Sequence, residues 1–442
     1  MRKSMPKKEV INKILKKVLK EINPKEDVVK KARPFLKELD EALKKLKINA
    51  YAFLGGSTAK NTYLEGDYDI DVFVRFNYEE YKDKEQELSN ILEKALKKLP
   101  KESSKTLKRQ NGSRDYFHIK KDKLFFEIVP VLEINNPELA INITDMSPLH
   151  VAYVNKACKK NSELNNEIRL TKRFAKSARV YGAETHISGF SGHIIDLLTI
   201  YAGSFLKLLE LTKKWSKLEL ENSSIIIDLE KHHKFPKREI SKDKQTSPIL
   251  LVDPVQPYRN AAAALSKEKL EMFIKAATAF LKEPKESFFE IKKLTPKTIR
   301  EEQKSKQGKL FVLKFVMEDL GKNVTGAIAM KAYEFILKEA KKNDFKILES
   351  KFEYSDKKHE ALVFYRFKEE VLEEEKELLG PPTKLKKDVA AFKKKHKNKE
   401  VYERGTRLFV KTKRIFLEPK KFIKEIIKEK YVSERVKKIE VF

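Results

Sequence analysis

Apolar and polar positions alternate with two different periods along the first 150 residues. From about Lys8 to Leu46, apolar residues recur every three or four positions, which predicts a helix that Pro24 interrupts and a second helix after it. Residues 78–99 repeat the helical spacing, whereas shorter apolar runs predict buried β-strands. These runs lie at 50–56, 68–76, 114–121 and 123–134, with a hairpin turn at Lys121–Asp122. The pattern predicts a mixed sheet with helices.

Helical spacing dominates from about Pro148 to Leu281, and a mixed pattern follows. The predicted elements are one basic helix at 166–182, one apolar helix at 192–215, a short strand, proline-rich turn and helix within 247–265, and a strand–helix–strand–strand order over 309–367. An acidic helix and a "GPP" hinge at 380–382 precede a basic remainder. The fold class that we predict is therefore α+β, in several domains.

The charge balance points to a polyanionic partner. Among 442 residues, Lys and Arg number 96 against 66 Asp and Glu, which gives a net charge of +30. A Lys/Glu-rich surface of the thermophile type explains many charges of both signs, but it does not explain this imbalance. Nucleic acid is the simplest partner, bound through its phosphates.

Cysteine usage and hydropathy favour a cytoplasmic location. The single cysteine, Cys158, excludes a disulfide framework within the chain and suits a reducing compartment. No apolar run approaches the length of a membrane span. Residues 1–22 are amphipathic and lack the apolar core of a signal peptide, so we expect a surface helix there.

Two aspartates in the stretch "FLGGSTAKNTYLEGDYDIDVFVRF" suggest a metal site. Asp69 and Asp71 lie two residues apart in a predicted strand, so their carboxylates share a face. Adjacent anions repel unless a cation lies between them, and oxygen ligands beside a phosphate suit Mg²⁺. Glu127, a lone acid in another apolar run, is the candidate third ligand of a two-metal site for phosphoryl transfer.

The glycine–serine turn before these aspartates is a candidate phosphate cradle. Gly55 and Gly56 allow close approach of the backbone, and a helix capped by Ser57 would offer free N–H groups. Alone, a glycine pair is usually only a turn, and an Asp-x-Asp is usually a solvated strand edge. The two features together, with Glu127, favour a nucleotide site.

These motifs resemble the nucleotidyltransferase superfamily of DNA polymerase β, poly(A) polymerases and CCA-adding enzymes, and most closely the archaeal (class I) CCA-adding tRNA nucleotidyltransferases. The resemblance covers most of the chain, strongly to about residue 285 and more weakly beyond. The matching stretches are "GGSTAKNTYLEGDYDIDVF", "FFEIVPV", "NEIRLTKRFAKSARVYGAE", "ISGFSGHIIDLLTIYAGSF" and "LLVDPVQPYRNAAAALS". It implies a polymerase β-like catalytic head (1–150), a helical neck binding the base and triphosphate (151–285), an α+β body (286–375) and a basic tail contacting tRNA (376–442).

The resemblance implies template-free addition of C, C and A to the 3′ end of tRNA from CTP and ATP. It assigns metal binding and catalysis, with Mg²⁺, to Asp69, Asp71 and Glu127. The positions that it implies for nucleotide binding are Gly56, Ser57, Lys60, Ser147, Lys172, Tyr181 and Arg259, the last reading the incoming base. Relatives also suggest a homodimer.

The chain departs from the family pattern at three positions. Lys60 stands where arginine is frequent, Glu127 where aspartate is frequent, and Met146 where a basic residue is common. Without the family match, Lys172 would be interpreted as a solvated lysine and Tyr181 as an aromatic at the edge of the core. We interpret His118 and His150 as hydrogen-bonded structural histidines, with no third soft ligand evident, and Trp215 as a core residue.

Two alternatives remain open from the sequence. One is another template-free enzyme of the poly(A) polymerase kind, and the other is a non-catalytic RNA-binding protein on the same fold. Against the second, the three acids are all retained. A protein that serves every tRNA should contact duplex shape and phosphates, for which residues 384–399 and 407–414 are basic candidates.

Overall fold

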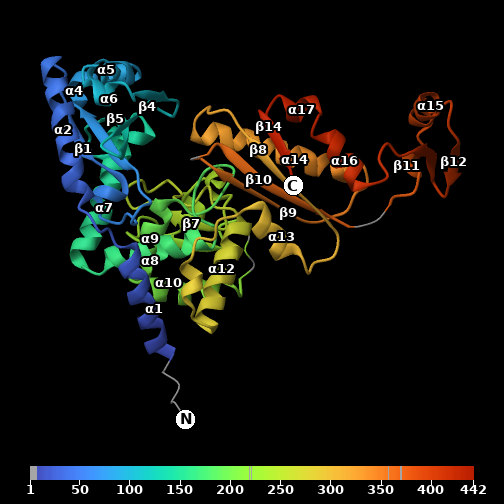
Figure 1. Cartoon of the computed structure of the whole chain (residues 1–442), viewed down its shortest axis with the longest axis horizontal. Helices are drawn as coiled ribbons and strands as arrows, with labels where there is room; N and C mark the ends of the chain where they lie inside the picture. Colours follow the sequence, from blue (N-terminus) through green and yellow to red (C-terminus); the bar gives the residue numbers. More distant parts are fainter. Residues whose placement is uncertain (1–6, 219, 221, 357, 369–370) are drawn as a thin grey trace, which may run out of the picture. The chain divides into compact units, whose positions relative to one another are not determined.

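The computed structural model describes residues 7–442 except 219, 221, 357 and 369–370 (Figure 1). It divides into two compact units, Met1–Lys292 and Lys293–Phe442. The first six residues of the predicted N-terminal surface helix lie outside the described residues. The finer division into head, neck, body and tail stays a prediction.

The first unit begins with two helices and a five-stranded sheet of order β1-β2-β5-β4-β3. The predicted mixed sheet with helices is confirmed, but its short strand β3 was not predicted. Strands β2 and β5 are parallel, and the other neighbours are antiparallel. The elements are α1 (Lys7–Ile22), α2 (Val28–Lys45), β1 (Ala50–Leu54), α3 (Gly56–Ala59), β2 (Ile70–Phe76), α4 (Tyr78–Tyr81), α5 (Leu88–Leu96), α6 (Lys101–Ser104), β3 (Lys108–Gln110), β4 (Tyr116–Lys121) and β5 (Leu124–Leu132).

The two faces of this sheet are covered by different helices. Even-numbered residues of β2, such as Val72 and Val74, pack against α2 and α5. The odd-numbered Phe73 packs on the other face with Val151 of α7 (Ser147–Lys160). Because side chains alternate along a strand, the face that carries Phe73 also carries Asp71 and Arg75.

Three local predictions for this region are wrong. Strand β1 is at the sheet edge and only half-buried, with Tyr51 and Phe53 exposed. The predicted helix 78–99 is broken, because a 3₁₀ segment at Lys82–Glu87 separates α4 from α5. The helix after the glycine pair begins at Gly56 with Gly55 as its N-cap, so Ser57 lies inside the helix and does not cap it.

A second core unites the N-terminal helix α1 with the helices that follow the sheet. Its members include Leu15 of α1, Phe174 of α8, Leu198 of α9 and Phe273 of α12. The elements are α8 (Leu164–Ser177), α9 (Gly192–Ala202), α10 (Phe205–Trp215), β6 (Ile225–Asp228), α11 (Pro236–Glu239), β7 (Ile249–Val252) and α12 (Lys267–Lys282). Trp215 is buried here, as predicted.

The single apolar helix expected at 192–215 is two helices. Gly203 has a φ of +80° and ends α9, and the Ser204 side chain accepts a hydrogen bond from Lys207 N at the start of α10. Glycine adopts this left-handed conformation without steric strain, which is why the chain turns at this point. The basic helix expected to end near Gly182 ends earlier, at Ser177.

The second unit contains the predicted strand–helix–strand–strand module in a sheet of order β14-β8-β10-β9. Helices α14, α16 and α17 contribute to one core on this sheet, and α13 packs with Val312 and Phe364 in another. The elements are α13 (Pro296–Gln303), β8 (Lys309–Val316), α14 (Lys322–Lys342), β9 (Ile347–Ser355), β10 (Glu360–Phe367), α16 (Pro419–Ile426), α17 (Lys430–Ser433) and β14 (Lys438–Val441).

A separate three-stranded sheet occupies the basic stretch near the C-terminus. It has the order β11-β13-β12, with β11 (Glu375–Pro382), β12 (Val401–Arg404), β13 (Arg407–Lys413) and helix α15 (Lys386–Lys395). The predicted acidic helix and hinge are therefore wrong where the structure describes them, although 369–370 lie outside the described residues. The prolines of "GPP" fit β11 because this strand is at the edge of its sheet.

None of the described helices combines the length and the apolar character that a membrane crossing requires.

Candidate active site

The predicted acidic residues meet on two neighbouring strands. Asp71 of β2 is directly opposite Glu127 of β5 in the parallel register, so both side chains lie on one face of the sheet. Asp69 directly precedes β2 and is exposed. His118 of β4 is opposite Glu127 on its other side, with His118 Nε2 3.3 Å from Glu127 Oε2. His118 is thus hydrogen-bonded, as predicted.

The charges of these acids act on one another. Burial is the main cause that raises the pKa of Asp71 to about 7; the Glu127 and Asp69 carboxylates contribute to this rise, and Lys60 opposes it. Burial and the two neighbouring carboxylates both disfavour the ionised form of Asp71, and the charge of Lys60 offsets only part of this effect. A divalent cation is the group that would supply the missing charge.

The glycine turn lies against the same carboxylate. Gly56 has a φ of +52°, and a Cβ atom at this position would overlap Oδ2 and Cγ of Asp71. A Cβ on Gly55 would likewise overlap the ring of Phe73. The glycine pair is therefore required here by the close approach of the turn to β2. Ser57 follows Gly56 in the same short helix.

Lys60 and Lys172 share one buried carboxylate, Asp196. Lys60 Nζ lies 2.5 Å from Asp196 Oδ2, and Lys172 Nζ lies 3.2 Å from Asp196 Oδ1. Lys172 also donates hydrogen bonds to the carbonyl and the hydroxyl of Thr62, at 3.2 and 2.9 Å. Two of the three donors of the Lys172 ammonium therefore go to Thr62, and its charge pairs with Asp196. Lys172 is buried, not solvated.

Burial and charge oppose each other in this group. Burial lowers the pKa of Lys172 to about 8, although Asp196 raises it. Burial raises the pKa of Asp196, but Lys172 and Lys60 outweigh burial and hold this pKa below its usual value. Asp196 was not among the residues predicted for the site. The sequence does contain a signal for Asp196, because this residue is a lone acid in the apolar helix α9, as Glu127 is in its strand.

Tyr181 lies beside the acids and the lysines. Burial raises the pKa of its hydroxyl, and the negative charges of Asp196 and Asp71 act in the same direction. The ammonium of Lys176 lies 4.4 Å from the centre of the Tyr181 ring. A Cβ on Gly192 would come within 2.9 Å of the Tyr181 hydroxyl oxygen, so the start of α9 packs closely on this side chain.

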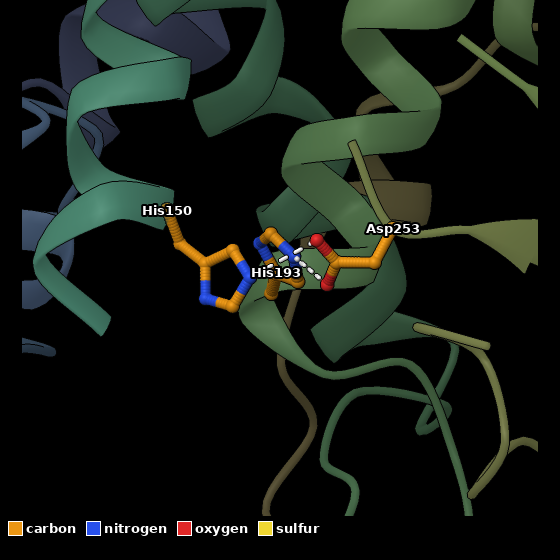
Figure 2. A group of neighbouring side chains, drawn as sticks. All are labelled: His150, His193 and Asp253. Carbon is orange, nitrogen blue, oxygen red and sulfur yellow. Dashed lines mark hydrogen bonds and ion pairs between the residues drawn. The ribbon is translucent and has the colours of Figure 1, made fainter. Parts of the chain in front are cut away.

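Arg259 is held by a second buried carboxylate, Asp253. Arg259 Nη1 donates to Asp253 Oδ2 at 2.8 Å, and the arginine side chain remains 38% exposed. His150 Nε2 lies 3.1 Å from Asp253 Oδ1, and His193 Nε2 lies 3.2 Å from Asp253 Oδ2. Figure 2 shows the carboxylate directed at both imidazole rings. Burial raises the pKa of Asp253, but the two histidines hold it well below its usual value.

The trio of His150, His193 and Asp253 also meets the distance requirement for a metal site. In the described part of the chain, it is the group whose potential ligand atoms all lie within 4.8 Å of one another. The three predicted acids are spaced more widely than this trio. His150 is hydrogen-bonded as predicted, but His193 and Asp253 are partners that the sequence did not reveal.

Hydrogen bonding argues against a metal on Asp253. Its Oδ1 also accepts the backbone N–H groups of Val255 and Gln256, at 2.9 and 3.2 Å. With the two histidines and Arg259, five groups surround a carboxylate that has about four lone-pair sites. We interpret this cluster as a hub that orients Arg259.

Ser147 is the first residue of α7, three positions before His150 on the same helix. The following residues thus lie around the start of β2, with Tyr181 beside them: Gly56, Lys60, Asp69, Asp71 and Glu127. Arg259 belongs to the Asp253 hub. The positive charge of Lys60 contributes to lowering the pKa of His193 in that hub.

Three family models match successive parts of the chain. Residues 36–150 match a nucleotidyltransferase domain, residues 166–290 match the second domain of tRNA nucleotidyltransferase, and residues 282–439 match the C-terminal domain of CCA-adding enzyme.

Curated relatives of archaeal origin agree with these models. The chain is 30% identical to a CCA-adding enzyme of Methanocaldococcus jannaschii over 97% of this chain and 95% of that protein. It is 31% identical to a CCA-adding enzyme of Methanococcus maripaludis, over 86% of this chain and 83% of that protein. A CCA-adding enzyme of Nanoarchaeum equitans is 36% identical over 58% of this chain, and that match spans 62% of the relative, which is less than two thirds of its length.

One solved structure shares the fold of part of the chain. A structure of Cid1, described by its RNA terminal uridylyl transferase activity, has a TM-score of 0.51 at 13% identity and covers 65% of this chain and 99% of that chain. At this identity the likeness shows the nucleotidyltransferase fold alone.

Proposed function

The chain belongs to the family of archaeal CCA-adding enzymes, and we propose that it adds C, C and A to the 3′ end of tRNA from CTP and ATP at the site around Asp71. The tRNA 3′-hydroxyl would attack the α-phosphorus in line, and pyrophosphate would leave. Such a reaction is catalysed mainly by positioning and by charge neutralisation. The observation that carries this proposal is the register that places Glu127 beside Asp71, with Gly56 against the same carboxylate.

We assign Mg²⁺ to Asp69, Asp71 and Glu127. The residues fit the ion, because their oxygens are hard ligands and the neighbouring carboxylates contribute to the raised pKa of Asp71. When bound, the metal would stabilise the negative charge that develops on the attacking and leaving oxygens. His118 would orient the Glu127 carboxylate through its contact with Oε2.

We assign the triphosphate to the Gly56–Ser57 turn, Lys60 and Ser147. Lys60 is in place beside the acids, but its ammonium contacts Asp196 in this structure. Binding of a phosphate would therefore compete with Asp196 for Lys60. Lys172 would not need to contact the phosphate, because its ion pair would keep Asp196 neutralised when Lys60 turns toward a phosphate. Tyr181, which lies next to Asp196 and Asp71, is the proposed contact for the ribose.

Arg259 is the proposed reader of the incoming base. Its guanidinium is partly exposed, and Asp253 fixes one of its nitrogen atoms. A planar group with donors in fixed positions suits the hydrogen-bond pattern of cytosine and adenine. Rejection of guanine and uracil would then follow from unpaired polar groups in the wrong complex.

The decisive assay supplies each NTP separately to tRNAs that end at the discriminator base, at the first C and at the second C. The proposal expects C, C and A to be added in turn. Repeated addition of A to every substrate would instead support the poly(A) polymerase-like alternative. Asp71→Asn should abolish addition and leave tRNA affinity nearly unchanged. Asp83→Asn, in an exposed segment of the same unit, is the matched control. Unaltered turnover in Asp71→Asn would contradict the site assignment.

The remaining expectations also belong to this proposal. Residues 384–399 and 407–414 are the proposed tRNA contacts of the tail, so tRNA binding should weaken steeply with salt. We propose the cytoplasm as the location, in accord with the single cysteine, and a homodimer, which sedimentation would test.

A further inference from the structure

A basic groove lies on the catalytic face of the sheet, beside helix α7. It has a volume of about 550 Å³ and lies between strands β1 and β2 and one face of α7. The residues on which the argument rests are Phe53, Arg75, Ala152, Lys156, Lys159 and Lys160. None of the described residues that line the groove is acidic. The site proposed above makes no use of this groove.

Where the structure describes the chain, no neighbouring carboxylate neutralises the four cations of this groove. Within the described residues, Arg75, Lys156, Lys159 and Lys160 form no ion pair, whereas Lys60, Lys172 and Lys176 of the same unit are each paired. The Nε of Arg75 is buried and has no hydrogen-bond partner among the described residues. Four neighbouring positive charges repel one another, so an anion in the groove would relieve their repulsion.

The aromatic side chains of β1 hold Arg75 in place. The Arg75 guanidinium lies 5.7 Å from the ring centre of Tyr51 and 5.5 Å from that of Phe53. Tyr51 is itself fixed, because its hydroxyl donates to Glu133 at 2.5 Å. Phe53 remains 37% exposed and presents a ring beside the cations. Cations next to an exposed aromatic ring are the combination that binds phosphates and stacks a base.

The position of the lysines in α7 does not explain the groove by itself. Lys159 and Lys160 lie in the last turn of α7, where the helix dipole favours cations. Lys156 lies one turn earlier, and Arg75 is on a strand, so the dipole does not account for them. Ala152 lies one turn before Lys156 on the same face of α7, and its small side chain leaves room for close approach.

We propose that this groove binds the sugar–phosphate backbone of the tRNA substrate, with a base or ribose against Phe53. A second copy of the chain fits less well, because a symmetric contact would place these four cations against four like charges. The inference rests on the proposed function, since tRNA is the polyanion that the reaction supplies.

The test compares two charge reversals on opposite faces of the sheet. Lys156→Glu/Lys159→Glu alters the groove, and Lys44→Glu/Lys45→Glu makes the same charge change at the exposed end of α2. The groove variant should raise KM for tRNA at least tenfold, with kcat and KM for CTP unchanged. Its plot of log affinity against log salt should be shallower by roughly 1.4–1.8, which corresponds to two lost phosphate contacts. The α2 variant should change neither quantity to this extent.

A direct readout is lysine acetylation followed by mass spectrometry. Lys156 and Lys159 should be protected by tRNA and not by CTP, while Lys44 and Lys45 stay reactive. Equal effects of the two variants, or protection by CTP alone, would overturn the inference, the latter in favour of a nucleotide site. A changed sedimentation coefficient in the groove variant would overturn it in favour of a subunit interface. If the wild-type protein adds no C to tRNA, the proposed function itself fails. This result is distinct from the outcomes above, because each of them is measured on a protein whose wild type is active.

Discussion

The backbone of Gly56 lies so close to the Asp71 carboxylate that position 56 has no room for a side chain. A Cβ at position 56 would overlap the Asp71 carboxylate and lie 3.0 Å from Asp71 Cβ, and the backbone there has a φ of +52°. The glycine is thus fixed by two independent constraints, one steric and one conformational. Both concern the carboxylate to which we assign the metal.

Gly56→Ala should abolish nucleotide addition, because Asp71 must move to make room. Gly66→Ala is the matched control, since Gly66 has a φ of +66° and open space around its Cβ position. The control should lose only the roughly 1–2 kcal/mol of unfolding free energy that a left-handed backbone costs an alanine, and it should keep its activity. Urea unfolding and a CTP-addition assay measure the two effects. Full activity in Gly56→Ala would show that the Asp71 carboxylate tolerates displacement.

Asp71 should make the metal-free protein less stable at high pH. Its folded-state pKa of about 7 is raised above the unfolded value of about 4, so between these values the folded state holds a proton that the unfolded state has lost. The free energy of unfolding then falls as pH rises through this window. In EDTA at pH 8, Asp71→Asn should be more stable than the wild type by on the order of 1–2 kcal/mol, and much less so at pH 5.

Added Mg²⁺ provides the second arm of this experiment. It should stabilise the wild-type protein at pH 8 and leave Asp71→Asn nearly unaffected, because ligand binding to the folded state shifts the unfolding equilibrium. Asp83→Asn should behave as the wild type under both conditions. The raised pKa would be contradicted if, in EDTA, the stability of the wild-type protein rose between pH 5 and pH 8 while that of Asp71→Asn fell.

Asp196→Asn should destabilise the fold strongly. It leaves the ammonium groups of Lys60 and Lys172 buried without a counter-charge, a change that typically costs about 3–5 kcal/mol. Asp67→Asn removes the partner of Lys176 at a more exposed position and should cost less than about 1 kcal/mol. Chemical denaturation of both variants provides the comparison, and equal losses would mean that the buried triad is not special.

Asp253→Asn should weaken base recognition and leave tRNA binding intact. Arg259 loses its ion pair, so its guanidinium is no longer oriented, and kcat/KM for CTP should fall roughly tenfold with poorer rejection of UTP. Because the pKa of Asp253 lies well below its usual value, the defect should be the same from pH 6 to pH 8. Glu239→Gln, which alters a different histidine–carboxylate contact, is the control. A change in KM for tRNA alone would contradict the role of the hub.

The local chemistry of the catalytic strand can be predicted from the sequence alone. Alternation along β2 and β5 places Asp71 and Glu127 outward from apolar neighbours, and only eleven residues separate Ser57 from Asp69, so the acids and the turn could be found without coordinates. The charge imbalance and the family motifs likewise depend on composition and on short stretches of chain.

Only the tertiary structure decided which groups neutralise one another. Lys60 and Asp196 are 136 positions apart, and His150 and Asp253 are 103 apart, so no local pattern relates them. The break of the apolar helix at Gly203 and the exposed edge of β1 also depended on packing, because a hydrophobic period shows what can be buried and not what buries it. The groove beside α7 is of this kind, since it exists only where two elements distant in sequence lie side by side.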